Sequence, residues 1–526
     1  MRRRTLRASL RALVLTAAVS VALVPQSAVV QSLEAAQSLE VLQGANPAVI
    51  ELDEATLAPA RGSARRPNVI LITSDDQAVS DLDYMPYTER LLARQGVTYD
   101  NFVSPHPLCC PARAEMISGQ YGHNNGVHHN HGTWGGWQAF RRPRANVGAW
   151  MQAAGYNTGF TGKFLNGYEE AMDKVPGWTF FDPSVRNVYG PYDITLLNNY
   201  QPATYEGVYT ADLVDIRTRA MIREFAALDR PFFIYSSQIA PHGMKVDRKW
   251  RPPVPAERHA KMFVHARPPS MRKPSYREAN LSDKYSKYRV PTVKGDHMIL
   301  RLHRQRIRSL QAVDESVRNI VRELGRVGEL DNTVIIFTSD NGWLNGEHNY
   351  VGKTPPWEES LRIPMVVRGP GIPKNVHRRQ TMTLLDLVPT MLELGRAKAT
   401  VRLDGKSLLP TLRSARAKGY DSHLIQSGDT TTPWEYRGVR TDRYTYARFT
   451  DGFVELYDRE RDPFQQRSVT DNPRYRPIQR ELGRRTRILQ KCAGPVCRTS
   501  FGPLPEPKPL PKPPAAERRK RPADRS

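Results

Sequence analysis

Two apolar runs of strand length, each followed directly by a polar pair, restrict the fold of this chain more than any other feature. A continuous apolar run is typical of a strand that is buried on both faces of a sheet. The runs and their pairs are 68–73 with Asp75 and Asp76, and 333–338 with Asp340 and Asn341. A third such run, 231–235, leads into His242.

Helical patterns alternate with these runs, most clearly over 306–324, where apolar residues recur at helical spacing. We therefore expect an α/β fold with a large mixed, mostly parallel sheet that is flanked by helices. From about residue 400 the pattern changes to short alternating segments. These predict a smaller C-terminal antiparallel-sheet subdomain, closed by a helix near 478–489. The predicted strands of this subdomain are 437–440, 443–449 and 453–457.

The two ends of the chain differ in composition from its middle. The first residues hold five arginines and then an apolar run over 12–24, which is typical of an export signal and too short for a comfortable membrane span. We therefore expect a protein without stable membrane insertion that is secreted, or held at the cell surface or in the periplasm. The expected parts are a signal peptide at 1–30, a linker at 31–65, a catalytic domain at 66–400, a C-terminal subdomain at 401–500 and a disordered Pro/Lys/Arg-rich tail at 503–526.

The chain of 526 residues has a formal net charge of +24. The first thirty residues contribute +5 and the tail from Gly502 contributes +4, which leaves +15 for the rest. Such a charge favours anionic partners such as nucleic acid, acidic lipid or a sulfated polymer. No recognised nucleic-acid motif is present, so we expect no nucleic-acid partner. Cys492 and Cys497 lie close in sequence, and a local disulfide suits an exported protein.

The polar pairs after the two strands are candidate metal ligands. In an α/β sheet, ligands gather beyond the carboxyl ends of the strands, so both pairs are expected at one edge. Three carboxylates and an amide give oxygen-only ligation, which suits Ca²⁺ or Mg²⁺. A single strand-end aspartate is as often a helix cap or a turn residue. Two converging pairs make the metal site the better interpretation.

The segment Leu108-Cys109-Cys110-Pro111-Ala112-Arg113 is the second candidate for chemistry. Pro111 suits the first turn of a helix, so Cys109 is expected just before a helix N-terminus, where unpaired N–H groups favour an anion. Arg113 lies one turn further on. The segment predicts either a nucleophile in an electropositive site or a buried cysteine pair at the start of a helix.

The pattern Cys-x-Pro-x-Arg, formed by Cys109, Pro111 and Arg113 and followed by Ser118-Gly119, resembles the signature of the sulfatase family. The resemblance extends from about residue 67 to 473. It implies an alkaline-phosphatase-like fold and a formylglycine that a formylglycine-generating enzyme makes from Cys109. It also implies a metal ion, usually calcium. The implied metal ligands are Asp75, Asp76, Cys109 as formylglycine, Asp340 and Asn341.

Three further residues match the family in register. Lys163 and Lys353 resemble its two sulfate-binding lysines, and His242 resembles the histidine at the leaving oxygen. One position departs from many arylsulfatases, because Leu165 stands where they have a histidine. The sequence around Cys110 and Leu165 resembles the glucosamine-6-sulfatase-like branch. The base that replaces the missing histidine stays open, and its candidates are His128, His129, His131 and His348.

The resemblance implies a hydrolase of sulfate esters. The expected substrates are sulfated sugars, as in N-acetylglucosamine-6-sulfatases, or aryl sulfates. Two alternatives remain, namely a phosphonate or phosphate monoester hydrolase, and an exported anion-binding protein without catalysis. We further expect the basic stretch 245–288 to surround the mouth of the site and to contact a polyanionic sugar chain.

Overall fold

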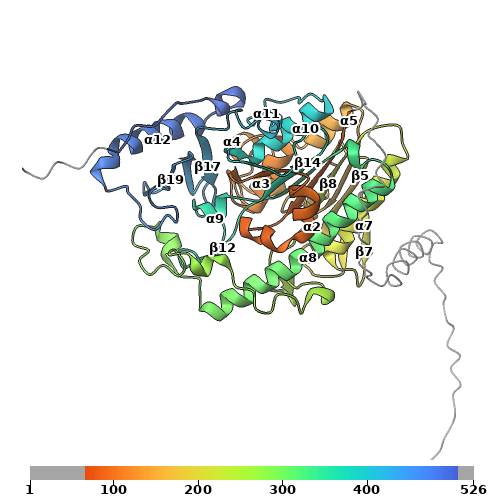
Figure 1. The fold of residues 1–526 in the computed structure, drawn as a ribbon, viewed down its shortest axis with the longest axis horizontal. Helices are drawn as coiled ribbons and strands as arrows, with labels where there is room; N and C mark the ends of the chain where they lie inside the picture. The colour runs from red at the N-terminus through yellow and green to blue at the C-terminus, as the bar shows by residue number, and fades with distance from the viewer. Residues whose placement is uncertain (1–65, 508–526) are drawn as a thin grey trace, which may run out of the picture. The chain divides into compact units, whose positions relative to one another are not determined.

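Ten strands form one sheet, and its five central strands run parallel (Figure 1). The computed structural model describes residues 66–507, so the expected signal peptide, the linker and the tail from residue 508 lie outside the described residues. In sheet order the strands are β15 (Val376–Arg378), β2 (Gly96–Tyr99), β14 (Met365–Arg368), β11 (Thr333–Ser339), β1 (Asn68–Ser74), β8 (Phe232–Ser237), β4 (Asn157–Gly162), β5 (Phe180–Arg186), β6 (Ile194–Asn198) and β7 (Gln201–Tyr205). The strands at the two sides include antiparallel pairs, and the sheet is therefore mixed but mostly parallel, as predicted.

Side chains of β1 alternate between two hydrophobic cores. Val69 and Leu71 face one core, whereas Ile70 and Ile72 face the other. The strand is buried along its whole length, which explains its apolar run. The helices of the first core are α3 (Cys109–Ser118), α5 (Val147–Ala153) and α10 (Leu387–Gly395), and those of the second are α7 (Thr210–Ala226) and α8 (Asp296–Arg326).

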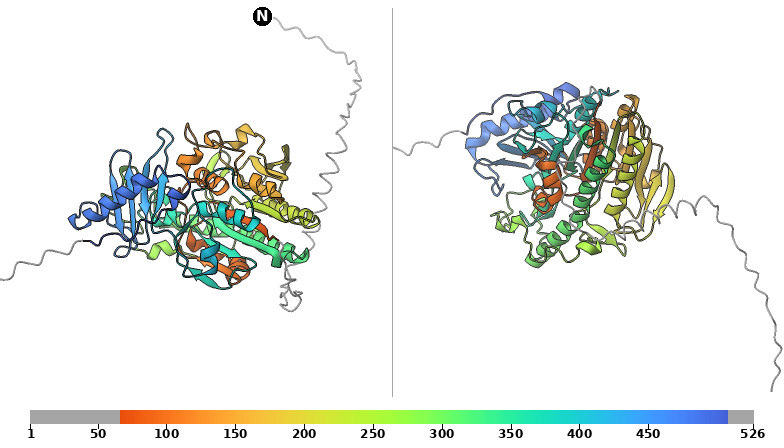
Figure 2. Two further views of the ribbon diagram at one scale, coloured as in Figure 1. Left: turned by 90° about the horizontal axis from the view of Figure 1, so that it is seen from above. Right: turned by 45° about the vertical axis from the view of Figure 1, so that its right-hand side comes forward.

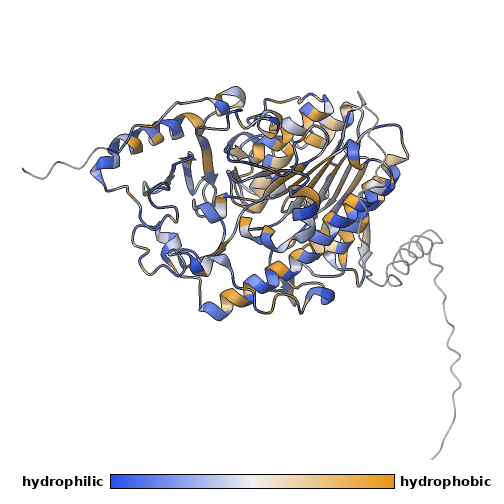
Figure 3. Cartoon of the chain, in the orientation of Figure 1, coloured by the Kyte–Doolittle hydropathy of each residue, from blue (hydrophilic) through white to orange (hydrophobic). Residues whose placement is uncertain are grey.

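The colouring by hydropathy follows this arrangement (Figure 3). The strands of the large sheet are mostly hydrophobic, whereas α8 carries both hydrophobic and hydrophilic stretches. The buried residues of α8 include Leu310, Val313 and Val317, which repeat at helical spacing. The helix is therefore amphipathic and covers the sheet with one face.

Four antiparallel strands form the predicted C-terminal sheet. Its strands are β17 (His423–Ser427), β18 (Tyr436–Arg440), β19 (Tyr444–Phe449) and β20 (Val454–Asp458). Helix α12 (Arg476–Leu489) lies across one face of this sheet (Figure 2). The other face packs through Tyr436 and Phe449 on Trp357 and Leu361 of the main body.

Several boundaries differ from the expectations. Strand β8 continues to Ser237, two residues past the predicted end, and α8 begins at Asp296, before the predicted 306. Strand β17 was missed because His423 and Gln426 interrupt its apolar pattern, although both are buried. The Cys492–Cys497 disulfide is confirmed, with Cα atoms 5.1 Å apart. Residues 503–507 of the expected disordered tail are described, and there Glu506 pairs with Arg443 at 3.0 Å.

The remaining elements are short. They include α2 (Pro86–Thr88), α4 (Gly122–Asn125), α6 (Tyr168–Ala171), α9 (Glu358–Leu361), α11 (Leu409–Arg413), β3 (Phe102–Val103), β9 (Met244–Val246), β10 (Lys249–Arg251), β12 (Leu344–Asn345), β13 (Val351–Gly352) and β16 (Met382–Thr383). No helix within residues 66–507 has both the length and the apolar character that a membrane span needs.

Candidate active site

The carboxyl ends of β11, β1 and β8 lie next to one another in the sheet, and polar residues follow each of them. Ser74 of β1 pairs with Ser339 of β11, and Thr73 pairs with Ser237 of β8. The chain then turns at Asp76, whose φ of 66° lies in the left-handed region. As the strand-end rule predicted, the two polar pairs meet at one edge, where Asp76 N–H donates to Asp340 at 3.1 Å.

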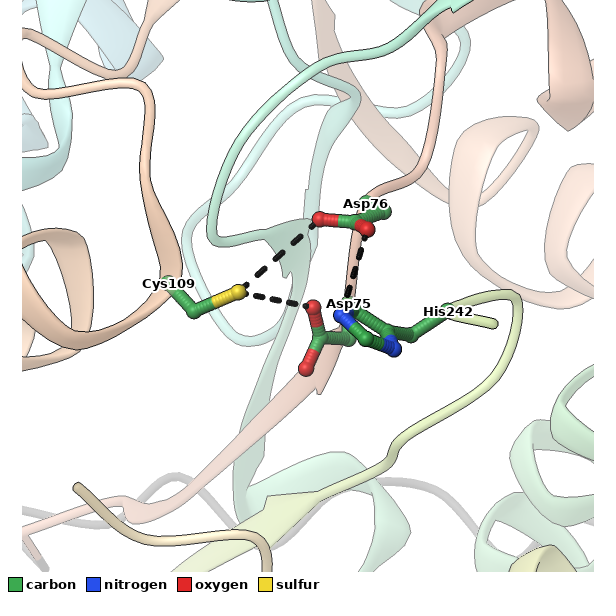
Figure 4. Close-up of side chains that lie close together, drawn as sticks. All are labelled: Asp75, Asp76, Cys109 and His242. Carbon is green, nitrogen blue, oxygen red and sulfur yellow. Dashed lines mark hydrogen bonds and ion pairs between the residues drawn. The ribbon is translucent and has the colours of Figure 1, made fainter. Parts of the chain in front are cut away.

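Helix α3 brings Cys109 to this edge. The helix begins at Cys109 itself, two residues before Pro111, and all ten of its residues are buried. The Cys109 Sγ atom lies 3.4 Å from Asp75 Oδ1 and 4.0 Å from Asp76 Oδ1 (Figure 4). His242 enters the same group, and its Nε2 lies 3.5 Å from Asp76 Oδ2. Ligand atoms of these four residues all lie within 4.8 Å of one another.

Arg113 joins α3 to the ends of all three strands. Its Nε donates to Asp340 at 2.9 Å, its Nη2 donates to Asp75 at 3.1 Å and its Nη1 donates to Ser237 Oγ at 2.7 Å. The guanidinium group is 2% exposed, so these charge-assisted bonds compensate for its burial. Arg113 therefore fixes the position of Cys109 relative to both polar pairs.

Two lysines complete the group. Lys163 follows β4 and contacts Asp75, whereas Lys353 follows β13 and contacts Asp76. Lys353 Nζ also lies 2.7 Å from Cys109 Sγ. The structure thus brings together all nine residues that the sequence nominated as catalytic residues or metal ligands, apart from the candidate bases. They are Asp75, Asp76, Cys109, Arg113, Lys163, His242, Asp340, Asn341 and Lys353.

Burial and neighbouring charges together shift the pKa values of the groups in this site. Burial alone would raise the pKa of Asp75, but Lys163, His242 and Arg113 lower it well below its ordinary value. Burial raises the pKa of Asp340 to about 6, and the neighbouring Asp75 adds to that rise. Burial and Asp75 also raise the pKa of the Cys109 thiol to about 12. Burial lowers the pKa of His242 to about 4, although Asp76 opposes this shift.

The donor set fits a hard divalent cation. Carboxylates of Asp75, Asp76 and Asp340 converge, and the carbonyl oxygen of the Asn341 amide is buried without a hydrogen-bond partner. Oxygen ligands of this kind suit Ca²⁺ or Mg²⁺. The three carboxylates face three cationic side chains, Arg113 among them. The charge of a divalent cation would be cancelled by a sulfate monoester and one further oxyanion. Binding of all three would therefore leave the net charge of the site unchanged.

Several side chains at the site were missed by sequence reasoning. Ser237 would have been found if β8 had been extended by two residues. Arg306 of α8 donates to the backbone carbonyl of Asp76 and, at 3.1 Å, to Asp81. A lone arginine within a helix gives no sequence signal for such a contact, because the site lies 230 residues away in the chain.

Tyr189 is a further residue that was missed. The Nζ atom of Lys163 lies 4.8 Å from the centroid of its ring, and the ring of His242 lies 5.0 Å away. Its hydroxyl accepts a hydrogen bond from Asn166 Nδ2 at 2.9 Å. Within residues 66–507, the Tyr189 hydroxyl donates a hydrogen bond to no other residue. Tyr189 lies between β5 and β6, in a segment without a motif.

The histidines that could replace the missing one lie outside the four-residue group. The Nδ1 atom of His348 is hydrogen-bonded to Glu278 at 2.7 Å, and the centroids of the His348 and Trp357 rings lie 4.4 Å apart. His128 stacks on Trp434 with ring centroids 4.0 Å apart. His131 is exposed. Leu165 itself is 2% exposed and belongs to the core below the site.

The basic stretch 245–288 holds fewer available charges than its sequence indicates. Lys273 pairs with Glu347 and Glu359, and Lys284 is fully buried beside acidic side chains. Arg258 and Lys287 are also paired with carboxylates. Much of this charge therefore stabilises the loops. Lys245 remains near the site, where it lies over the exposed ring of Trp250 at 5.2 Å.

The sheet, its oxygen-rich edge and the buried Cys-x-Pro-x-Arg helix define a hydrolase site of the sulfatase type. The sulfatase family model matches residues 67–397, and a second model, described as N-sulphoglucosamine sulphohydrolase, C-terminal, matches residues 346–492. The chain belongs to the sulfatase family.

Similar proteins agree with this membership. The chain is 29% identical over 490 residues to human N-acetylglucosamine-6-sulfatase, which covers 83% of this chain and 86% of that protein. It is 34% identical over 384 residues to the extracellular sulfatase SULF-1 homolog of Drosophila melanogaster, which covers 69% of this chain. The chain spans about a third of the length of that protein. It spans half of the length of the extracellular sulfatase Sulf-1 homolog of Caenorhabditis elegans.

Solved structures share the fold. One holds its substrate D-glucosamine-2-N,6-O-disulfate and matches with a TM-score of 0.67 and 22% identity, over 81% of this chain and 98% of that one. A phosphonate monoester hydrolase of Agrobacterium radiobacter matches with a TM-score of 0.64 and 19% identity, over 81% and 95%. At these identities the likeness establishes the alkaline-phosphatase-like fold.

Proposed function

We propose that a formylglycine made from Cys109 is the nucleophile of this sulfatase. The observation that carries the proposal is the position of Cys109 at the first turn of α3, beside Asp75 and Asp76 and 2.7 Å from Lys353 Nζ. A partner is implied, because a formylglycine-generating enzyme must oxidise the cysteine. When present, the hydrated aldehyde supplies the attacking oxygen and a second hydroxyl that allows sulfate to leave.

We propose Ca²⁺, with Mg²⁺ as the second choice, as the metal of the site. The chain's ligands would be the carboxylates of Asp75, Asp76 and Asp340 and the amide oxygen of Asn341, together with the modified Cys109. The ion would supply positive charge beside the nucleophile and the sulfate oxygens. Arg113 would keep two of the carboxylates in place, because it already bonds to Asp75 and Asp340.

The remaining side chains have roles that follow from their positions. Lys353 contacts Cys109 and Lys163 contacts Asp75, and both would hold sulfate oxygens by charge-assisted hydrogen bonds. His242 lies at the rim, 14% exposed, and in its imidazolium form would deliver the Nε2 proton to the leaving oxygen. Its Nδ1 is paired with the Gly243 carbonyl oxygen at 2.6 Å, which leaves Nε2 toward the site.

We propose sulfated sugars as the substrates, with glucosamine 6-sulfate first among them and aryl sulfates as small surrogates. Support comes from human N-acetylglucosamine-6-sulfatase as a relative over most of the chain. The structure with bound D-glucosamine-2-N,6-O-disulfate supports the same class. Trp250, 54% exposed beside His242, offers a ring on which a sugar could stack at the leaving-group side.

Export is part of the proposal. The extracellular sulfatases among the relatives support a secreted, cell-surface or periplasmic enzyme. The signal peptide at 1–30 and the domain boundaries near 66, 400 and 503 are proposed on the sequence pattern. Cleavage after the signal is tested by the N-terminal sequence of the protein from its natural host.

A second function is favoured by one observation, the shared fold with a phosphonate monoester hydrolase. Side-by-side kinetics separate the two. An aryl sulfate, an aryl phosphate and an aryl phosphonate are assayed with the modified enzyme at equal metal concentration. A kcat/KM highest for the sulfate supports the proposal. A higher value for either phosphorus ester would replace it, and no turnover of any of them would favour an anion-binding protein without catalysis.

A further inference from the structure

A groove of about 530 Å³ lies beside α12, on the C-terminal sheet and away from Cys109. Aromatic and basic side chains dominate its lining. Those that matter here are Trp434, Arg437, Tyr446, Arg448 and Arg487. None of the three arginines forms an ion pair with any residue that the structure describes between 66 and 507. The groove therefore carries a local positive charge that the described part of the protein does not neutralise.

Two of these arginines are placed in a way that costs stability. Arg437 of β18 and Arg448 of β19 are direct partners in the antiparallel register, on the face that α12 covers. Like charges directly opposite each other destabilise a sheet. Burial lowers the pKa of Arg437, in agreement with a charge that lacks a partner. A local arrangement that works against folding is typical of a functional surface.

The aromatic side chains give the groove a second property. Arg437 lies over the ring of Trp434 at 5.2 Å, and Tyr446 forms part of the wall. Gly483 sits inside helix α12, where glycine is unfavourable. A Cβ atom there would lie 3.5 Å from the Tyr446 hydroxyl and 3.7 Å from Arg487, so the glycine keeps this part of the groove open.

The groove is connected to the active site through one stack of rings. Trp434 stacks on His128 with an interplanar angle of 24°. His128 begins a loop in which the Asn130 side chain accepts a hydrogen bond from the Cys110 N–H at 2.8 Å. These two contacts therefore link Trp434 at the groove to the first turn of α3.

We propose that this groove binds a sulfated polysaccharide chain, one residue of which is presented to Cys109. Guanidinium groups match the oxygens of sulfate groups, and the half-buried ring of Trp434 offers a surface for a pyranose ring, whereas Tyr446 is buried. The inference rests on the proposed function, because it extends the proposed substrate from a single sulfated sugar to a polymer. It adds a binding site that lies outside the catalytic group.

The test measures binding rather than turnover. A fluorescently labelled, highly sulfated heparin octasaccharide is titrated into the full chain at several salt concentrations, with Cys109 replaced by alanine so that no substrate is consumed. The first variant carries Arg437→Gln, Arg448→Gln and Arg487→Gln. The matched control carries Arg322→Gln, Arg413→Gln and Arg416→Gln, three exposed arginines that lie outside the groove.

We expect the groove variant to bind at least about tenfold more weakly and with a shallower salt dependence, because fewer counterions are exchanged. Its thermal midpoint should stay the same or rise, since the like-charge pair is removed. The control should bind as the parent does. Equal weakening in both variants would mean unspecific charge attraction and overturn the proposal, as would unchanged binding in the groove variant.

A second variant tests the groove without removing any arginine. Gly483→Glu places a negative charge in the groove and improves the helix propensity of α12, so the fold should be kept. Octasaccharide binding should again fall about tenfold or more. Single-stranded DNA of similar charge should compete poorly, and equal competition would overturn the assignment to a polysaccharide. If the octasaccharide binds through the groove and the modified enzyme turns over an aryl sulfate but never desulfates the octasaccharide, its presentation to Cys109 is overturned. If the modified enzyme turns over neither sulfate ester, the proposed function fails while the groove stands.

Discussion

Arg113 and Asp340 form a buried ion pair at 2.9 Å that ties the start of helix α3 to the end of strand β11. The two residues are 227 positions apart in the chain. The same guanidinium group reaches Asp75, so one side chain sets the spacing between the cysteine helix and both pairs of proposed metal ligands.

Arg113→Lys should abolish most activity while the protein remains folded. A lysine has one ammonium group and cannot reproduce the fork that bonds Asp340, Asp75 and Ser237 at once. We expect kcat/KM for an aryl sulfate to fall at least about 100-fold. Steady-state kinetics with a check of metal content tests this, and wild-type activity in the variant would contradict the role given to Arg113.

Removal of the metal should inactivate the enzyme reversibly. After chelation, activity should return with Ca²⁺ or Mg²⁺, because the ligand set consists of oxygens. Metal at about 100 times its dissociation constant should also stabilise the fold by about 2.7 kcal/mol. Thermal unfolding with and without added Ca²⁺ measures this. Recovery with Zn²⁺ alone, or full activity after chelation, would contradict the proposed site.

Tyr189→Phe should raise KM more than it lowers kcat. The variant keeps the ring beside Lys163 and His242 but removes the hydroxyl whose proton we expect a bound substrate to accept. Loss of one such hydrogen bond corresponds to a change of roughly tenfold. Full kinetics on a sulfated glucosamine decides the matter, with Tyr192→Phe as the control, since Tyr192 is partly buried and packs against the core around α7 and α8. An unchanged KM would show that the hydroxyl makes no contact with substrate.

Glu358→Gln should destabilise the junction between the two sheets. Glu358 pairs with Arg440 at 2.7 Å through both carboxylate oxygens, and Arg440 is 1% exposed. The loss of one partner of a buried pair should cost about 3 kcal/mol. Glu460→Gln is the control, because Glu460 is 68% exposed in its pair with Arg443 and should contribute less than about 1 kcal/mol.

The effect of Glu358 should also depend on pH. Burial alone would raise its pKa, but Arg440 and Arg459 lower it below the ordinary value. The ion pair therefore stabilises the fold above the unfolded pKa of about 4.3 and loses this contribution as the pH falls toward the folded pKa. Denaturant unfolding at pH 7 and pH 4 should give a smaller difference between wild type and Glu358→Gln at pH 4. An equal difference at both pH values would contradict the shift.

The sequence predicted the parts of this site that follow from local rules. Asp75 and Asp340 were found because buried parallel strands read as apolar runs and end at one edge of the sheet. Cys109 was found from the proline and arginine that follow it. The sequence resemblance then added Lys163 and Lys353, which lie on loops that no local rule could place at this edge, and it gave a role to His242, which follows the third apolar run.

Other features depend on contacts that no pattern along the chain encodes. Tyr189 reaches the site because β5 and β6 place their connection over Lys163. Arg437 and Arg448 face each other through the register of β18 and β19, which needs the position of the turn between them. The ion pairs of Lys273 and Lys284 likewise appear only in the folded chain. The sequence therefore overestimated how many basic side chains of 245–288 are available to bind an anion.

The most direct test of the account is the mass of the tryptic peptide Gln95–Arg113, which carries Cys109, from protein made in its natural host. Conversion of Cys109 to formylglycine lowers the mass by about 18 Da, and fragmentation distinguishes Cys109 from Cys110. The account predicts this loss at Cys109 and an activity on sulfate esters proportional to the modified fraction. An intact thiol at Cys109 in protein that still hydrolyses sulfate esters would contradict it.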